Sequence, residues 1–373
     1  MSLLTRALPP LAVAASAALT AACIQAPPVR PPADVLEVGN REGSRVALEV
    51  NARTGTLRYL TSAVDDGERA RLAELAPNVE LVADLTADEA LALAHTVHGA
   101  DAHLVTPAFL EAATELRWVQ SWSAGVERYL AIDELVARDE VVLTNMKGVH
   151  GPVIAEHVMA LLLSLCRDLP AYHAAQRAGT WDRGAGSGQR ALAGSTMLVA
   201  GMGGIGTEVA ERAFGFDMRV LATVRRAREA PAFVHELGTA DDLDRFLPQA
   251  DVVVIALPLT DETRGLFDAA RLDAMKDDAI LVNIARGAIV DTDALVAALD
   301  EGRLAGAALD VTDPEPLPAG HALWGRDDVL ITPHVAGRAA LTGERRDLLF
   351  AENLARFAAG EPLWNVVDKE AGY

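Results

Sequence analysis

The sequence predicts an α/β protein built from two parallel sheets, and two observations carry that prediction. Short apolar runs alternate with helix-like stretches along most of the chain, which is the pattern of βαβ units in parallel sheets. In addition, a glycine-containing turn links an apolar run at 196–200 to a helical segment at 205–214, and a second apolar run follows at 219–224. The chain has 373 residues, 51% of them hydrophobic, and is long enough for two domains with substantial cores.

The glycine turn has the spacing of a dinucleotide-binding loop. Gly201 suits the tight turn, Gly203 a close approach of the backbone to a pyrophosphate, and Gly206 the packing of the helix on the strand. The helix N-terminus then offers free N–H groups to the phosphates. We therefore predict a doubly wound, Rossmann-type cofactor domain, contacted by the cofactor at Gly201, Gly203, Gly204, Ile205 and Gly206. The alternative is an ordinary glycine-rich turn.

The end of the second strand bears on the choice of cofactor. An NAD-binding domain usually carries an acidic residue about 20 positions beyond the glycines, for the ribose hydroxyls. Here the strand ends in Val224, Arg225 and Arg226. Two guanidinium groups suit a 2′-phosphate, so we predict NADP as the preferred cofactor, with NAD possible. The alternative is that both arginines are merely solvated.

The segment from Arg45 to Met146 has the same alternating pattern but contains no glycine-rich phosphate loop. It is therefore predicted to handle the substrate. Its expected strands and helices lie at 56–60, 65–75, 79–82, 87–94, 102–105, 107–114 and 117–120. The turn Ser123-Ala124-Gly125 follows the last of these strands, where small residues can present bare N–H groups to a carboxylate. The alternative is an ordinary turn.

Four further strands are predicted in the second half, at 251–256, 279–283, 305–309 and 329–332. Their near-continuous apolar character fits a sheet buried on both faces, and with the strands at 196 and 219 they make about six. Their carboxyl ends lie at the edge where ligands bind. These ends and the loops after them supply the predicted site residues Pro258, Thr263, Ala285, Arg286, Asp310, Glu315, His334 and Gly337.

One arginine, one carboxylate and one histidine among these residues suffice for a specific chemistry. Arg286 can hold the carboxylate and the 2-oxygen of a 2-oxo acid, and His334 can protonate the carbonyl oxygen as hydride arrives. Glu315 can orient the histidine ring. Taken singly, Arg286 and Glu315 could be members of surface ion pairs, and His334 a core histidine. His150 and His157, near the start of a helix expected at 153–169, are interpreted as structural.

Composition excludes several classes of partner and site. The formal net charge of −20 argues against nucleic acid as a partner. The two cysteines, Cys23 and Cys166, form neither a disulfide framework nor a metal cluster. No grouping of His, Cys or carboxylates has zinc-site spacing, so no metal is expected.

With these motifs in hand, the sequence resembles the D-isomer-specific 2-hydroxyacid dehydrogenase family, which includes glyoxylate/hydroxypyruvate reductases. The resemblance covers about residues 100–370. It is strongest over 148–156, 199–206, 283–291, 309–316, 331–337 and 361–368. It implies that Arg286 binds substrate, that Glu315 and His334 are catalytic, and that Asp310 lies near the nicotinamide carboxamide. It also implies that Ser123, Ala124 and Gly125 form the carboxylate-binding loop and that the enzyme is a homodimer.

We therefore expect NAD(P)-dependent hydride transfer between a small 2-oxo acid and a D-2-hydroxy acid. The cofactor domain is expected at 150–335, inserted in a smaller, flavodoxin-like α/β substrate domain formed by 45–149 and 336–373, with a cleft between the two. One alternative is a non-catalytic dinucleotide sensor or scaffold on the same fold. Another is an oxidiser of formate or phosphite.

Residues 1–32 differ from the rest of the chain. An alanine-rich apolar run precedes Thr20-Ala21-Ala22-Cys23 and a proline-rich linker. This resembles a bacterial export signal, and the small residues before Cys23 resemble a lipobox, in which a lipidated cysteine tethers the protein to a membrane. The expected location is then the cell envelope. The alternative is the cytoplasm, because an exported enzyme would meet little NADPH.

Overall fold

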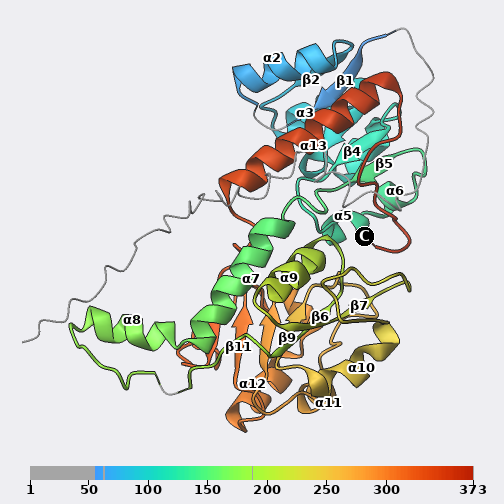
Figure 1. The fold of residues 1–373 in the computed structure, drawn as a ribbon. Helices are drawn as coiled ribbons and strands as arrows, with labels where there is room; N and C mark the ends of the chain where they lie inside the picture. The colour runs from blue at the N-terminus through green and yellow to red at the C-terminus, as the bar shows by residue number, and fades with distance from the viewer. Residues whose placement is uncertain (1–54, 62–63, 187, 373) are drawn as a thin grey trace, which may run out of the picture.

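The computed structural model describes residues 55–61, 64–186 and 188–372. The predicted leader at 1–32, with Cys23, lies outside the described residues, as does the predicted start of the substrate domain at 45–54. The rest of the chain forms two parallel α/β sheets, one above the other in Figure 1. The predicted fold class is confirmed.

The first sheet has five parallel strands in the order β2-β1-β3-β4-β5. This is the flavodoxin-like order, as predicted. Its strands are β1 (Leu57–Leu60), β2 (Val79–Val82), β3 (Gly99–Asp101), β4 (Trp118–Gln120) and β5 (Val142–Thr144). The connecting helices are α2 (Asp66–Leu75), α3 (Ala87–Leu93), α4 (Pro107–Ala112), α5 (Glu127–Leu130) and α6 (Asp133–Val136), with 3₁₀ turns η1 (Ala94–Thr96) and η2 (Ala102–Leu104).

The strand predicted at 102–105 is wrong. β3 occupies Gly99–Asp101, and Ala102–Leu104 forms a 3₁₀ turn. The reason is tertiary packing, because a Cβ at Gly99 would overlap the ring of Tyr59. Glycine therefore stands inside the strand to make room for an aromatic side chain on β1, and the strand lacks the branched apolar residues that mark strands in a sequence.

The C-terminal segment packs with the first sheet. Helix α13 (Ala340–Ala359) runs beside β1 and α2, so the blue and red ends of the described chain lie together in Figure 1. Its Phe350 ring centroid is 5.4 Å from that of Tyr59, and Phe357 is 5.2 Å from Trp118. After the helix, Val367 donates its backbone N–H to Leu143 of β5.

The second sheet has seven parallel strands in the order β12-β11-β10-β9-β6-β7-β8. Its strands are β6 (Thr196–Ala200), β7 (Arg219–Val224), β8 (Glu236–Thr239), β9 (Val252–Ile255), β10 (Ile280–Asn283), β11 (Gly306–Leu309) and β12 (Val329–Ile331). Its helices are α7 (Gly151–Cys166), α9 (Gly204–Gly215), α10 (Leu243–Phe246), α11 (Ala269–Asp273) and α12 (Thr292–Asp300), with 3₁₀ turns η3 (Ala240–Asp242), η4 (Leu247–Gln249) and η5 (Gly287–Ile289).

Alternate residues of the central strands enter two separate hydrophobic clusters, one on each face of this sheet. In β6, Met197 and Val199 belong to the cluster that includes α7 and α9, whereas Leu198 and Ala200 belong to the cluster that includes α12. All five residues of β6 are buried. The predicted burial on both faces is confirmed. Truncating the buried Leu198 to alanine would lower the free energy of unfolding by about 2–5 kcal/mol.

The strand order places the functional edge. The chain proceeds outward from β6 to β7 on one side and returns to β9 on the other side of β6. The carboxyl ends of β6 and β9 therefore flank a topological switch point, which is where open α/β sheets bind ligands.

One helix stands apart from both sheets. Helix α8 (Leu169–Arg177) has no buried residue and projects away from the body in Figure 1. In the described part of the chain, no helix has the length and apolar character needed to cross a membrane.

Candidate functional site

The glycine loop lies at the switch point and has the shape that a dinucleotide requires. Gly201 has φ +97°, and a Cβ there would lie 2.7 Å from Ala256 O, at the end of β9. A Cβ on Gly206 would overlap Gly201 O, so the helix can approach the turn only with glycine. Gly203 is the N-cap of α9, with no side-chain capping bond and open space where a Cβ would be. The loop therefore fits a cofactor pyrophosphate held by backbone N–H groups of the first turn, which begins with Gly204 and Ile205.

The strand next to the loop fixes its position. Thr223 of β7 accepts a hydrogen bond from Gly201 N at its hydroxyl, at 3.1 Å, and from Met202 N at its carbonyl, at 2.7 Å. Beyond the strand, Arg225 and Arg226 are exposed, as a 2′-phosphate site requires. Arg228 donates to Met202 O at 2.7 Å and so braces the same loop. The sequence analysis missed Arg228, although a third arginine so close to the predicted pair was a usable signal.

The loops after β9 and β10 are internally tied. Thr263 Oγ1 donates to Pro258 O at 2.7 Å, so these two predicted cofactor residues shape one loop. After β10, Asn283 accepts from Ala285 N and donates to Arg286 O, at 3.1 and 3.0 Å. This clamp orients the turn that presents the Arg286 side chain.

Arg286 meets the predicted substrate loop. A Cβ on Gly125 would overlap the Arg286 guanidinium, so a larger residue fits there only if the arginine side chain moves away. In the described chain, the amide N–H groups of Ala124 and Gly125 donate no hydrogen bond, whereas Ala124 O accepts from Asn145. The Ser123–Gly125 turn thus offers free donors beside a guanidinium, an arrangement suited to a carboxylate. Arg286 also pairs with Glu127, at 3.0 Å between Nε and Oε1, a contact the sequence analysis missed.

His334 and Glu315 form the candidate acid–base pair. Nδ1 of His334 lies 2.7 Å from Glu315 Oε1, and the two side chains are 49% and 42% exposed. His334 has φ +53°, in the left-handed region. With Nδ1 engaged by the carboxylate, the other ring nitrogen, Nε2, is the one that can exchange a proton with a substrate.

Asp310 holds the backbone that carries His334. Its buried carboxylate accepts hydrogen bonds from Thr332 Oγ1, Val335 N and Ala336 N, at 2.6–3.0 Å. His334 N in turn donates to Asp310 O at 2.8 Å. The predicted role of Asp310 near the nicotinamide stays a prediction, but its structural role explains the backbone conformation of His334.

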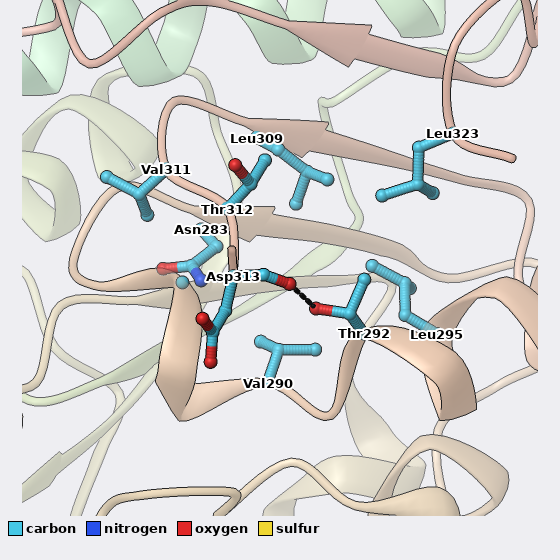
Figure 2. Close-up of a pocket in the computed structure, with 10 residues that line it drawn as sticks. Asn283, Val290, Thr292, Leu295, Leu309, Val311, Thr312, Asp313 and Leu323 are labelled. Atoms are coloured by element: carbon cyan, nitrogen blue, oxygen red, sulfur yellow. Dashed lines mark hydrogen bonds between the residues drawn. The ribbon is translucent and has the colours of Figure 1, made fainter. Parts of the chain in front are cut away.

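The turns that carry Arg286 and Glu315 pack directly on each other. A Cβ on Gly287 would overlap the backbone of Thr312, and Thr292 Oγ1 donates to Asp313 O at 2.8 Å (Figure 2). The cavity between these turns has a volume of about 10 Å³, enough for one water molecule at most. The cavity is therefore too small for a substrate or cofactor, and none of the predicted site residues lines it.

His150 and His157, which the sequence analysis interprets as structural, both make polar contacts within the fold. His157 Nε2 lies 2.9 Å from Thr332 Oγ1, the hydroxyl that donates to Asp310. His150 is buried beside Gly337, and its Nε2 accepts from Arg346 at 2.8 Å. Burial, with the Arg346 charge as a second cause, lowers the pKa of His150 to about 4. The ring is therefore neutral near pH 7.

Known proteins are similar to this chain over most of its length. Residues 159–336 match the model of the D-isomer specific 2-hydroxyacid dehydrogenase NAD-binding domain. A glyoxylate reductase of Aeropyrum pernix is 40% identical over 271 residues, which cover 70% of this chain and 79% of that protein. A glyoxylate reductase of Thermofilum pendens is 36% identical over 266 residues, covering 70% of this chain and 77% of that protein.

Solved structures are similar over most of the chain. A D-isomer specific 2-hydroxyacid dehydrogenase from Xanthobacter autotrophicus, in complex with NADPH, matches with a TM-score of 0.72 and 32% identity, covering 86% of this chain and all of that one. An NADPH-dependent glyoxylate/hydroxypyruvate reductase from Sinorhizobium meliloti, in complex with NADP, matches with a TM-score of 0.71 and 29% identity, covering 85% of this chain and all of that one. This chain belongs to the D-isomer specific 2-hydroxyacid dehydrogenase family.

Proposed function

We propose that this protein, a hydride-transferring oxidoreductase of 2-oxo and 2-hydroxy acids, reduces glyoxylate or hydroxypyruvate to the corresponding 2-hydroxy acid with NADPH. The observation that carries the proposal is the placement of three groups. Arg286 lies against the Ser123–Gly125 turn, and His334 is paired with Glu315 on the neighbouring turn. The relatives named as glyoxylate reductases support the choice of substrate.

Each group has a defined task in the reduction. Arg286 and the free N–H groups of the turn hold the substrate carboxylate and so orient the carbonyl carbon. The bound nicotinamide supplies the hydride. As negative charge develops on the carbonyl oxygen, protonated His334 donates its Nε2 proton to that oxygen, and in the reverse direction neutral His334 accepts it. Glu315, whose Oε1 lies 2.7 Å from Nδ1, holds the imidazole ring in this orientation.

The preference for NADPH rests on the end of β7. Arg225 and Arg226 stand where an acidic residue would bind the ribose of NAD. The NADPH and NADP complexes of the Xanthobacter and Sinorhizobium proteins support the same choice.

The test is a substrate panel run with both cofactors. Purified protein should oxidise NADPH, and NADH more slowly, in the presence of glyoxylate, hydroxypyruvate or a larger 2-oxo acid. A folded protein that oxidises neither cofactor with any of them would contradict the proposal, and activity confined to the larger 2-oxo acid would contradict the proposed substrates. Formate and phosphite, tested with NADP⁺ and NAD⁺, would reveal the oxidiser alternative. If H334A bound cofactor normally and left biological activity unchanged, the sensor alternative would hold.

We also propose that the protein is a homodimer. Helix α8 and the segment after it project from the body (Figure 1). Trp181 in that segment is 91% exposed. Leu169, at the start of α8, is half exposed. Leu169 and Trp181 expose large apolar side chains on one projecting segment, and this supports a contact with a second copy of the chain. Light scattering would test this, because a monomer at micromolar concentration contradicts it.

Finally, we propose that residues 1–32 direct export and that lipidated Cys23 tethers the enzyme in the cell envelope. The motif Thr20-Ala21-Ala22-Cys23 supports this. Mass analysis of the native N-terminus decides between the envelope and the cytoplasm, since an intact Met1 would contradict both processing and tether. A cytoplasmic enzyme would have ready access to NADPH.

A further inference from the structure

The substrate-binding arginine has an internal partner on the opposite domain. Arg286 Nε lies 3.0 Å from Glu127 Oε1, and Nη2 donates to Glu127 Oε2 at 3.4 Å. The remaining nitrogen, Nη1, donates to Ala285 O at 2.7 Å. Glu127 therefore takes the Nε/Nη2 edge of the guanidinium, which is an edge that a carboxylate fits with two parallel hydrogen bonds.

Glu127 lies at the predicted substrate loop. It is the first residue of α5, two positions after Gly125, and its Oε2 would be 2.6 Å from a Cβ on that glycine. The carboxylate of Glu127 and the carboxylate of a 2-oxo acid would thus use the same guanidinium edge beside the same turn. Both cannot pair with that edge at once.

The pair is exposed enough to exchange partners. The side chains of Arg286 and Glu127 are 32% and 38% exposed. Exposed ion pairs contribute little to stability and are screened by salt. The Glu127 side chain can therefore turn away from Arg286 when a substrate binds. Because its backbone stays in place at the start of α5, the carboxylate remains within a side-chain length of the site.

We propose that Glu127 is a specificity residue of the proposed reductase, an inference that rests on the function proposed above. It competes with the substrate carboxylate for Arg286, and after displacement its charge opposes a second negative group on the substrate. The enzyme then favours 2-oxo acids with one carboxylate and an uncharged or hydroxylated side chain. It disfavours 2-oxo dicarboxylates, because like charges at this range repel.

The experiment compares Glu127→Gln with Glu127→Asp, and with Glu134→Gln as the matched control. Glu134 is an exposed residue of α6 whose substitution makes the same charge change. Each protein is assayed with NADPH and glyoxylate, hydroxypyruvate, oxaloacetate or 2-oxoglutarate. In E127Q, the KM for the monocarboxylates should fall about twofold to fivefold, the range expected for an exposed ion pair, with little change in kcat.

The ratio between substrate classes is the decisive readout. In E127Q, kcat/KM for the dicarboxylates should rise by a further factor of about three or more over the monocarboxylates, because a repelling charge is removed. E127D should keep the wild-type preference for monocarboxylates, and E134Q should match the wild type throughout. In the wild type, added salt should narrow the difference between the two classes.

Two results would overturn the inference. A higher KM for every substrate in E127Q would mean that Glu127 positions Arg286 for the substrate instead of competing with it. An unchanged ratio between the two classes would mean that its charge does not reach the substrate. If the wild type proved inactive, the proposed function would fail separately. Calorimetric binding of D-glycerate and D-malate to the wild type and E127Q, with NADP⁺ present, would then still decide whether Glu127 discriminates by charge.

Discussion

His334 Nδ1 and Glu315 Oε1 lie 2.7 Å apart although the two residues are 19 positions apart in sequence. They come together because the turn after β11 and the turn after β12 leave adjacent strands on the same edge of the sheet. The Asp310 carboxylate, which accepts hydrogen bonds from Val335 N and Ala336 N, then fixes the backbone on the histidine side. The pairing of adjacent strands β11 and β12 therefore brings the two side chains together, and no local sequence motif does so.

Glu315→Gln should lower kcat without loss of fold. Glutamine keeps a hydrogen-bond partner at Nδ1 but removes the carboxylate charge beside the ring that transfers the proton. A hydrogen bond to a charged group contributes about 1.5–3 kcal/mol, and because this pair is half exposed we expect the lower end, about a tenfold fall. H334N should lower kcat by a larger factor, on the order of 10²–10⁴. Steady-state rates with saturating NADPH give both numbers, and an E315Q enzyme with wild-type kcat would show that the pair has no role in proton transfer.

Gly125→Ala should impair substrate binding. The added methyl group would overlap the Arg286 guanidinium, so the arginine must leave its position beside the Ser123–Gly125 turn. Losing one charge-assisted contact with the substrate carboxylate should raise KM about tenfold or more. The affinity for NADPH, measured by fluorescence, should stay near that of the wild type, because the glycine loop lies on the other domain.

Gly343→Ala is the matched control. A Cβ on Gly343, within helix α13, meets nothing within 4 Å. Alanine should therefore leave KM unchanged and raise the free energy of unfolding by up to about 1 kcal/mol. Equal KM values for G125A and the wild type would show that Arg286 does not bind the substrate from this position.

Local sequence patterns predicted those strands whose character depends only on residues nearby in the chain. The bounds predicted for β6 and β7, residues 196–200 and 219–224, agree with the structure, because fully buried strands are continuous apolar runs. The prediction misplaced β3 because Gly99 is needed there to make room for the ring of Tyr59, 40 residues earlier in the chain. β8 went unpredicted because it is a polar strand at the edge of the sheet.

The candidate site divides in the same way. Arg286, Glu315 and His334 each follow a strand and could be found from its end. Glu127 could not, because its significance comes from a contact with a residue 159 positions away. No periodicity or motif within α5 indicates which residue of the other domain will face it.

The arginines after β7 should control the choice of cofactor. R225A and R226A remove charges expected to meet a 2′-phosphate, so each should weaken NADPH binding about tenfold and NADH binding little. R228A acts on the loop through Met202 O and should weaken both cofactors alike. Dissociation constants from nucleotide fluorescence would separate the two effects. If R225A and R226A lost equal affinity for NADPH and for NADH, the two arginines would no longer support a preference for NADP.

His150 should make the free energy of unfolding depend on pH. Burial and the Arg346 charge lower its pKa to about 4 in the folded protein, against about 6.5 in the unfolded chain. Between these values the unfolded chain binds more protons, so the contribution of His150 is fully present above pH 6.5. It is lost as pH falls toward 4, by up to about 3 kcal/mol. Glutamine at this position can still accept from Arg346 and does not titrate, so urea unfolding of H150Q should show a shallower pH dependence than the wild type over this range. H103Q, which changes an exposed histidine, should keep the wild-type slope, and a wild-type slope in H150Q would mean that the ring is not held neutral by its surroundings.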